Sequence, residues 1–450
     1  MATLDALSTE PLSPTDRRRR AAEIRDRFER VRERTLALVA PLEWATLRKQ
    51  HVPILSPIVW DLGHIANFEE LWLIQRAAGE APMVDGYGVM FDAILNPRKD
   101  RERLPLPDQR TLFEYLGRVR ERALETLERW AEEGARGDRL LEGGFAFELI
   151  AEHEEQHHET ILQALQVMTE PPYVPALRRR LPAAGTAPAE MVRVAAGPFL
   201  LGTDEEGFVY DNERHAHEVH LPAFWIDAAP VTQGAYAAFV DDGGYRRREL
   251  WSDAGWAWLE ETGAEAPDYW VADGRDGWRV RNMDLLRPLP ADEPVVHVSY
   301  WEADAFARWA GKRLPTEPEW EKAATWDPAA GAKRRYPWGD EPPTPERANL
   351  DQLGFAPAPV GAYPDGVSAY GVHQMIGDVW EWTASDFGPY PGFESYPYAE
   401  YSEVFFGPDY KVLRGGSWAT RPAVARATFR NWDYPIRRQI FSGFRCARDE

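Results

Sequence analysis

The sequence predicts a multidomain protein of mixed α and α+β class, in which an N-terminal four-helix bundle precedes a domain with sparse regular structure. Three observations support this prediction: helical periodicity over residues 17–170, a stretch rich in proline and alanine at 171–190, and a different amino-acid composition, with few long periodic segments, from 191 onward. A chain of 450 residues is also too long for one ordinary hydrophobic core. We expect a loose tail over residues 1–16, a helical domain over 17–170, a linker over 171–190 and a second domain over 191–450.

The first half of the chain has the pattern of a helical bundle. In segments 22–38, 111–133 and 145–168, apolar residues recur at three- and four-residue spacing with charged residues between them. Short breaks at Ser56-Pro57 and Asn96-Pro97 separate such segments. Four long helices joined by short breaks favour an up-down bundle, and the cores of such bundles commonly hold metal sites.

The second half is rich in tryptophan and poor in long periodic segments. Four of the 19 tryptophans precede residue 190 and the other 15 follow it, among many Gly, Pro and Asp residues. A domain with little regular structure needs large aromatic side chains to fill the irregular gaps in its core. Short strands are expected at 192–202, 219–226, 295–298 and 411–413, and helices at 232–240 and 299–310.

Composition limits the classes of partner and the cellular compartment. The formal net charge is -21, and so acidic a surface repels phosphate backbones and anionic lipids, which argues against nucleic acid and membrane partners. No window reaches the roughly 18 consecutive apolar residues of a membrane span, and the N-terminus has no apolar run typical of a secretory signal. The single cysteine, Cys446, excludes an intrachain disulfide and a cysteine-based zinc knuckle. We therefore expect a cytoplasmic protein in which metal ligation falls to His, Asp and Glu.

Two histidines four residues apart point to a metal site. His153 and His157 lie in a segment expected to be one helix, where positions four apart share a face with Cβ atoms about 6 Å apart. Gln156 flanks the same face, whereas His158 points well away from it. With His64 far upstream, the pair supplies three imidazoles, which suit iron, zinc, copper and nickel. A site with three protein ligands keeps positions open for substrate and oxidant.

Ordinary core histidines are the alternative interpretation. The chain has 10 histidines, so a His-x-x-x-His spacing also arises by chance. His64 would then be a hydrogen-bonded core residue, and His51 is an equally distant candidate for the third ligand. The residues by themselves leave both interpretations open, and they do not identify the metal.

Two motifs resemble a known metalloenzyme family. The first is Ser-Pro-Ile-Val-Trp-Asp-Leu-Gly-His-Ile at 56–65, followed by Glu-Glu-Leu-Trp at 69–72, and the second is His-Glu-Glu-Gln-His-His-Glu-Thr at 153–160. In this order they resemble the DinB-like iron-binding domain of the sulfoxide synthases of ergothioneine biosynthesis. The resemblance implies a non-haem iron cofactor, Fe(II), held by His64, His153 and His157.

The second half carries strings that resemble a different family. They are Arg-Leu-Pro-Thr-Glu-Pro-Glu-Trp-Glu at 313–321, Gly-Asp-Val-Trp-Glu-Trp-Thr at 377–383, Val-Leu-Arg-Gly-Gly-Ser-Trp at 412–418 and Gly-Phe-Arg at 443–445. They resemble the formylglycine-generating-enzyme (sulfatase-modifying factor) family, whose fold is C-type-lectin-like, and most of these residues are expected to be architectural. Enzymes of that family work through a cysteine pair, so the single Cys446 excludes their activity. A DinB-like domain joined to this lectin-like domain resembles the sulfoxide synthases across nearly the whole chain.

The string Phe-Arg-Asn-Trp-Asp-Tyr-Pro-Ile-Arg-Arg at 429–438 suits a zwitterionic substrate. Arginine binds a carboxylate through two hydrogen bonds, aspartate holds an ammonium, and an indole face attracts a quaternary ammonium. A surface loop with solvated charges is the alternative interpretation.

Similarity to the family branch that uses γ-glutamylcysteine assigns roles to individual residues. It implies that the dipeptide binds Arg98, Asp433 and Arg437, and that N-α-trimethylhistidine (hercynine) binds Gln156, Asn431 and Trp432. These contacts come from both domains, so the resemblance places the active site at their interface. The branch also uses a tyrosine as proton donor, and the Tyr-x-x-Tyr-Ser ending of the stretch 390–402 selects Tyr398.

The resemblance therefore implies an O2-dependent, iron(II) sulfoxide synthase that joins the sulfur of γ-glutamylcysteine to imidazole C2 of N-α-trimethylhistidine. Its partners would be these small molecules and dioxygen, and we expect a monomer. Three alternatives stay open. They are an ovothiol-type synthase joining cysteine to C5 of histidine, a zinc-dependent DinB-like thiol transferase, and a non-enzymatic, metal-stabilised binding module.

Overall fold

Two units of different architecture make up the part of the chain that the computed structural model describes, residues 12–185, 190–205, 207–274 and 277–450. The first unit extends to Met168 and takes in residues 207 and 208, and the second holds the rest of the chain from Thr169 onward. Most of the expected tail, 1–16, falls outside the described residues, and the first helix begins at Pro14.

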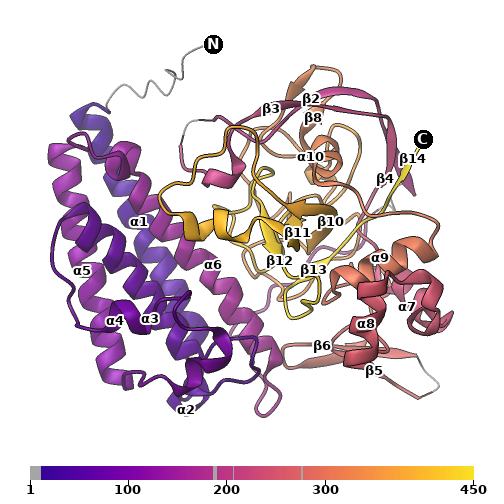
Figure 1. Cartoon of the computed structure of the whole chain (residues 1–450), viewed down its shortest axis with the longest axis horizontal. Coiled ribbons are helices and arrows are strands. Elements are labelled where there is room, and N and C mark those ends of the chain that lie inside the picture. Colours follow the sequence, from indigo (N-terminus) through magenta and orange to yellow (C-terminus); the bar gives the residue numbers. More distant parts are fainter. Residues whose placement is uncertain (1–11, 186–189, 206, 275–276) are drawn as a thin grey trace. The chain divides into compact units, whose positions relative to one another are not determined.

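The first unit is a bundle of four long helices with short helical turns between them (Figure 1). The long helices are α1 (Pro14–Val39), α3 (Ile58–Glu69), α5 (Gln109–Glu133) and α6 (Phe145–Val167), and α3 continues as a π-helix, Glu70–Ala77. The shorter elements are α2 (Trp44–Arg48), α4 (Tyr87–Met90) and the 3-10 turns Arg98–Arg103 and Arg139–Gly144. Helices α1 and α5 begin where the side chains of Ser13 and Asp108 accept hydrogen bonds from first-turn backbone N–H groups.

Four charged side chains form a buried network among these helices. Arg32 of α1 and Arg120 of α5 each bind both Glu69 of α3 and Glu154 of α6, with N···O distances between 2.6 and 3.2 Å. Glu69 is 0% and Glu154 is 1% exposed. Because an uncompensated buried charge is strongly unfavourable, the four groups must stay together, and they tie all four long helices into one arrangement.

The second unit consists of small sheets and short helices joined by long loops (Figure 1). Its largest sheet has the strand order β12 (Asn431–Asp433), β11 (Gly407–Arg414), β10 (Trp380–Phe387) and β13 (Ser442–Gly443), antiparallel except for the β10–β13 pair. Two three-stranded sheets have the orders β1 (Met191–Val194), β4 (Phe224–Asp227), β14 (Ala447–Asp449) and β5 (Trp270–Ala272), β6 (Trp278–Asn282), β7 (Leu285–Pro288). Strand β2 (Gly197–Leu201) pairs with β3 (His217–Leu221), and β8 (Trp326–Asp327) with β9 (Ala332–Lys333).

Helices of this unit are α7 (Gln233–Asp241), α8 (Asp253–Thr262), α9 (Tyr300–Trp309) and α10 (Glu317–Thr325). Its 3-10 turns are Asp211–Glu213, Gly244–Arg246, Arg248–Leu250, Pro364–Gly366, Ala399–Tyr401 and Glu403–Phe405. Helices α9 and α10 start with capping boxes, Ser299 with Glu302 and Thr316 with Glu319.

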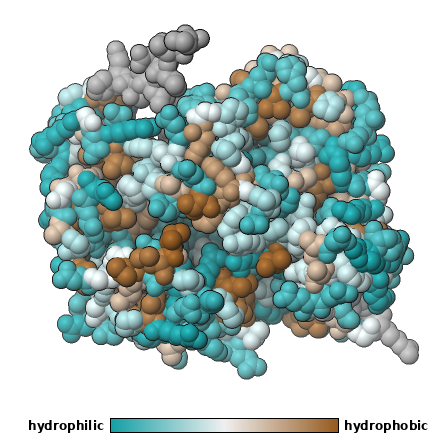
Figure 2. All heavy atoms as spheres, viewed as in Figure 1, coloured by the Kyte–Doolittle hydropathy of each residue, from teal (hydrophilic) through white to brown (hydrophobic). Residues whose placement is uncertain are grey.

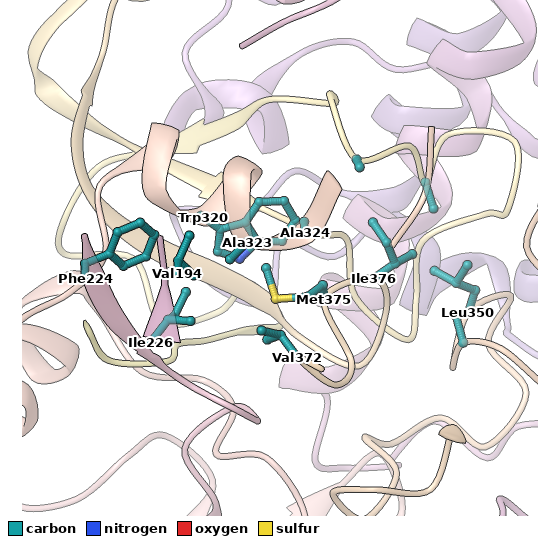
Figure 3. Close-up of a cluster of buried hydrophobic side chains, with 13 residues drawn as sticks. Val194, Phe224, Ile226, Trp320, Ala323, Ala324, Leu350, Val372, Met375 and Ile376 are labelled. Carbon is teal, nitrogen blue, oxygen red and sulfur yellow. The ribbon is translucent and has the colours of Figure 1, made fainter. Parts of the chain in front are cut away.

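The indole of Trp320 on α10 lies within a hydrophobic cluster of this unit (Figure 3). Strands β1 and β4 contribute Val194, Phe224 and Ile226, and loop residues such as Met375 complete it. Because loops supply so much of this core, large aromatic side chains are needed to close its gaps.

Buried ion pairs connect the strings that resemble formylglycine-generating enzymes. Glu317 accepts hydrogen bonds from Arg414 and Arg430, and Glu381 accepts them from Trp320 and Arg445. All six of these side chains are at most 4% exposed. These motif residues are therefore architectural, as predicted.

The predicted fold class, a helical bundle followed by an α+β domain with sparse regular structure, is confirmed. The helices expected at 232–240 and 299–310 correspond to α7 and α9, and the strand at 411–413 lies within β11. The segments 192–202 and 219–226 each contain two strands rather than one, because a turn interrupts them. The strand expected at 295–298 is wrong: this buried segment stays outside the sheets, and His297 has φ +64°, which a strand does not accommodate.

The described part of the expected linker, 171–185, forms no helix or strand, yet it packs on the second unit. Leu181 contacts the buried cluster of Ala358, Ala362 and Tyr363, and the N–H of Arg179 donates to the carbonyl of Leu353 at 2.7 Å.

Hydrophilic residues cover most of the face seen in Figure 2, with apolar residues in scattered groups. Among the described helices, none combines the length and the apolar character that crossing a membrane requires.

Replacing Arg120 by methionine should lower the free energy of unfolding of the bundle by about 3–5 kcal/mol, because two buried carboxylates would lose one of their cationic partners. Arg110 on the same helix is a matched control, since it pairs with the exposed Glu114 at 2.8 Å. The change Arg110→Met should cost less than about 1 kcal/mol. Denaturant unfolding followed by circular dichroism measures both, and equal stability of the two variants would contradict the prediction.

Candidate metal centre

Helix α6 presents two different polar faces. Its residues His153 and His157 lie on one of them, whereas Glu154 and His158, each one residue further along, face α1. The hydroxyl of Thr35 on α1 donates to Oε1 of Glu154 at 2.6 Å and lies 2.8 Å from Nε2 of His158. These contacts fix the rotation of α6 about its axis, and so they decide where His153 and His157 point.

The three predicted ligands lie together. Ring centroids are 5.0 Å apart for His64 and His153, 4.9 Å for His64 and His157, and 4.6 Å for His153 and His157. One nitrogen of each ring lies within 4.8 Å of the others, and the Nε2 atoms of His64 and His153 are 3.2 Å apart. Metal–nitrogen bonds of about 2.1 Å place neighbouring ligand nitrogens about 3.0–3.4 Å apart, so this spacing suits a shared metal ion.

Neighbouring polar groups orient two of the rings. Nδ1 of His64 donates to the carbonyl of Phe91 at 2.6 Å. Since a carbonyl only accepts, Nδ1 carries the proton and Nε2 keeps a free lone pair. Nδ1 of His157 lies 3.3 Å from Oδ1 of Asp61, which is 1% exposed and whose oxygens make no well-formed hydrogen bond. A buried carboxylate in this state is costly, and a cation held by the adjacent imidazoles would offset the cost.

Gly63 allows this arrangement. A Cβ atom at Gly63 would lie 2.1 Å from the Phe91 ring, so only glycine lets the loop that carries Phe91 approach α3 and reach His64.

Aromatic rings pack against the faces of two of the three imidazoles. Trp60 stacks on His64 at 4.8 Å and Phe68 stacks on His153 at 3.8 Å, while the guanidinium of Arg101 lies 3.5 Å from the centre of the Trp60 ring. Sequence reasoning missed these supports, although a signal was present: Trp60, His64 and Phe68 recur every four residues and so share one face of α3.

Burial lowers the pKa of His64 and His153 well below 6.5, and neighbouring imidazoles lower it further. Both rings are therefore neutral near pH 7, with lone pairs available for a metal. Three imidazoles beside a buried carboxylate are a donor set that fits a divalent transition metal.

Two more predicted residues lie in the first unit. Gln156 is partly buried on α6, one residue before His157. Arg98 is exposed at the start of the turn Arg98–Arg103, and its Nη1 lies 3.5 Å from the carbonyl of Ile54. His51 is not part of the three-histidine group among the described residues.

The second unit groups the other predicted substrate residues. Asn431, Trp432 and Asp433 form β12, in which Trp432 pairs with Val412 of β11. Trp432 stacks on Phe387 at 4.1 Å, and Nε of Arg437 lies 3.3 Å from Oδ1 of Asp433. These three consecutive residues therefore lie on an edge strand of a sheet and not in a mobile loop.

Tyr398 lies near Trp432, because the ring of Tyr401 contacts the rings of both residues. Asp211 fixes the segment on both sides of Tyr398, since it accepts hydrogen bonds from the N–H of Tyr396 at 3.1 Å and from the hydroxyl of Ser402. Burial raises the pKa of Tyr398 well above its ordinary value, and the charge of Asp211 raises it further. The phenol therefore stays protonated near neutral pH.

Known proteins share both parts of this architecture. The DinB superfamily matches residues 27–161, and the sulfatase-modifying factor enzyme 1-like domain matches residues 179–450. The hercynine oxygenase of Mycolicibacterium thermoresistibile is 47% identical over 436 residues, 95% of each chain. That of Mycobacterium tuberculosis is 48% identical over 427 residues, 93% of this chain and 97% of the relative. The chain belongs to the hercynine oxygenase family.

Membership of the hercynine oxygenase family makes this protein an enzyme of the oxygenase class. The second unit also matches the formylglycine-generating enzyme of Streptomyces coelicolor, 37% identical over 290 residues, 57% of this chain and 88% of the relative. That likeness concerns architecture, because the one cysteine, Cys446, is buried. Burial, with the charge of Asp227, raises the pKa of this thiol well above its ordinary value and makes it unreactive.

Cobalt(II) titration, followed by visible absorption, should give one bound ion per chain. The change His153→Ala should weaken this affinity by more than about 100-fold, because two imidazoles remain where three converge. The change His51→Gln is the matched control and should leave the affinity unaltered. Tight cobalt binding by the His153 variant, or its loss in the His51 variant, would overturn the assignment.

Proposed function

We propose that this enzyme is an iron(II)-dependent sulfoxide synthase that joins the sulfur of γ-glutamylcysteine to C2 of the imidazole ring of hercynine, N-α-trimethylhistidine. The product is γ-glutamyl-hercynylcysteine sulfoxide, on the route to ergothioneine. In this reaction dioxygen accepts four electrons. One oxygen atom goes to sulfur, and the other leaves as water with the hydrogens of the thiol and of imidazole C2.

The convergence of His64, His153 and His157 carries this proposal. Three protein ligands leave positions for other groups on the metal, as an oxygenase requires. The relatives named hercynine oxygenase, which match over more than nine-tenths of the chain, support hercynine as one substrate. Bound iron(II) would stabilise the substrate thiolate and supply the redox chemistry that activates dioxygen.

The dipeptide is assigned to Arg98, Asp433 and Arg437. A γ-glutamyl group carries an ammonium and a carboxylate on one carbon, and Asp433 with Arg437 offers the two complementary charges 3.3 Å apart. Arginine binds a carboxylate through two parallel hydrogen bonds, which fixes the direction of the ligand as well as its affinity. Arg98 is exposed and would bind the second carboxylate, that of the cysteine residue.

Hercynine is assigned to Gln156, Asn431 and Trp432. The Trp432 ring is held by stacking on Phe387 and by contacts with the rings of Tyr401 and Phe405. Such a group of aromatic rings attracts a quaternary ammonium, whose charge is spread over its methyl groups. Asn431 and Gln156 provide amide groups for the carboxylate and the imidazole. Orientation of both reactants is the main contribution of the protein to the rate.

Reconstitution with Fe(II) under anaerobic conditions, followed by exposure to air, tests the proposed function. Hercynine with γ-glutamylcysteine should give a product whose mass equals the sum of both substrates plus one oxygen atom and minus two hydrogen atoms. Coupling of cysteine to C5 of histidine instead would indicate an ovothiol-type synthase. Turnover with zinc in place of iron, without oxygen consumption, would indicate a thiol transferase.

The change Tyr398→Phe should divert the reaction from the sulfoxide to a sulfinate of the thiol substrate, because the phenol is assigned to deliver a proton to reduced oxygen. We expect the sulfoxide rate to fall by about 100-fold or more while oxygen consumption continues. Tyr401→Phe is the matched control, since it keeps the ring that stacks on Tyr210. Chromatography of both products measures the ratio, and an unchanged ratio in the Tyr398 variant would show that another group donates the proton.

A further inference from the structure

We propose that Arg438 is a positioning residue that holds the neighbouring segment 433–437 in the conformation that binds the thiol substrate. The inference rests on the proposed function, because it takes Asp433 and Arg437 as ligands of the dipeptide. Arg438 itself is assigned no contact with substrate. Its side chain is mostly buried and lies beside the fully buried Glu302 and the half-buried Asp268.

Two carboxylates and a carbonyl hold the guanidinium of Arg438. Nη2 donates to Oε1 of Glu302 at 3.0 Å and to the carbonyl of Ala266, and Nη1 lies 2.9 Å from Oδ1 of Asp268. The ring of Trp258 lies 5.6 Å from the guanidinium carbon. A planar group with several donors fixed by three partners cannot rotate freely, so Arg438 serves as an anchor.

Glu302 connects this anchor to the interior of the second unit. Its side chain is 0% exposed, and its Oε2 accepts the N–H of Ser299 at 2.8 Å as part of the capping box of α9. Its Oε1 also accepts the hydroxyl of Tyr245 at 2.5 Å, and that hydroxyl lies 3.1 Å from the hydroxyl of Tyr236. Arg438 is therefore bound to the start of a helix that is itself packed in the core.

The backbone of the segment is tied to the same helix start. The N–H of Tyr300, the first residue of α9, donates to the carbonyl of Pro435 at 3.0 Å, and Nδ1 of His297 donates to the carbonyl of Arg438 at 3.1 Å. On the other side, Asp433 pairs with Lys411 in the β11–β12 ladder. The segment 433–437 therefore spans a short gap between two fixed points, the sheet edge and α9.

The two consecutive arginines consequently have different tasks. Arg438 is committed to Glu302 and Asp268, whereas Arg437 lies 3.3 Å from Asp433. With the backbone direction fixed at Arg438, Arg437 keeps its place beside Asp433, and the segment presents both charges together. A loop that already has its bound conformation loses less entropy when the ligand binds, so affinity for the dipeptide depends on the anchor.

The test is steady-state kinetics of Arg438→Met with each substrate varied in turn. We expect the KM for γ-glutamylcysteine to rise by about tenfold, while the KM for hercynine and the iron content stay within about twofold of wild type. Arg438→Lys keeps the charge but not the planar fork, and it should recover part of the lost affinity. Arg308→Met on α9, which removes the ion pair between the exposed Arg308 and the half-buried Asp304, is the matched control and should change neither KM.

A KM for the dipeptide that stays at the wild-type value in Arg438→Met would overturn the proposal. An equal loss for both substrates, in proportion to lost folded protein, would overturn it as well. Hydrogen exchange of the segment 433–438 gives a readout that needs no substrate. Exchange should accelerate in Arg438→Met and not in Arg308→Met, and failure to accelerate would refute the anchor. Failure of the proposed function would appear separately, as the absence of sulfoxide from the wild-type enzyme.

Discussion

The buried network of Arg32, Glu69, Arg120 and Glu154 is the constraint on which the metal centre depends. Each of the four long helices contributes one charged group, and none of these groups can be left unpaired without a large cost. The network sets the rotation of α6 and of α3, which carry the three histidines on their other faces. A hydrophobic interface would tolerate small rotations of a helix, whereas paired buried charges do not. Precise placement of the ligand nitrogens follows from this polar core.

The second unit uses the same physical device for a different purpose. Its strands are short and its loops are long, so hydrogen bonds of regular structure cannot define the fold alone. Buried carboxylates such as Glu317 and Glu381 each receive two or more donors from distant parts of the chain. Glu302 does so for the segment that follows β12, and Asp211 does so for the segment that contains Tyr398. These hydrogen bonds to buried carboxylates therefore hold the loops of the second unit in fixed positions.

Prediction from the sequence succeeded for helices whose periodic pattern extends over many residues, and it failed for a short segment next to a change in chain direction. Repeats of three and four residues over long segments located α5 and α6 to within two residues at each end, because a helix is stabilised by its own local hydrogen bonds. The segment predicted at 22–38 found α1 but missed its first turns, since that helix begins at Pro14. The strand expected at 295–298 had the right apolar content, yet this segment leads into the start of α9 and lies outside the sheets. The stretch 171–185 has no periodicity, but Leu181 still finds a place in the core of the second unit. Apolar content indicates burial and does not by itself indicate which partner a segment has.

The sequence by itself determined the candidate ligands and the architecture. Spacing in a helix is local geometry, so His153 and His157 had to share a face, and the motif strings carried the resemblance that selected His64. Only the tertiary structure decided that His64 approaches that pair, that Phe91 and Asp61 accompany the imidazoles, and that Glu154 and His158 serve packing. These contacts join residues tens of positions apart, and their formation depends on the packing of whole helices. No local pattern in the chain encodes such distances.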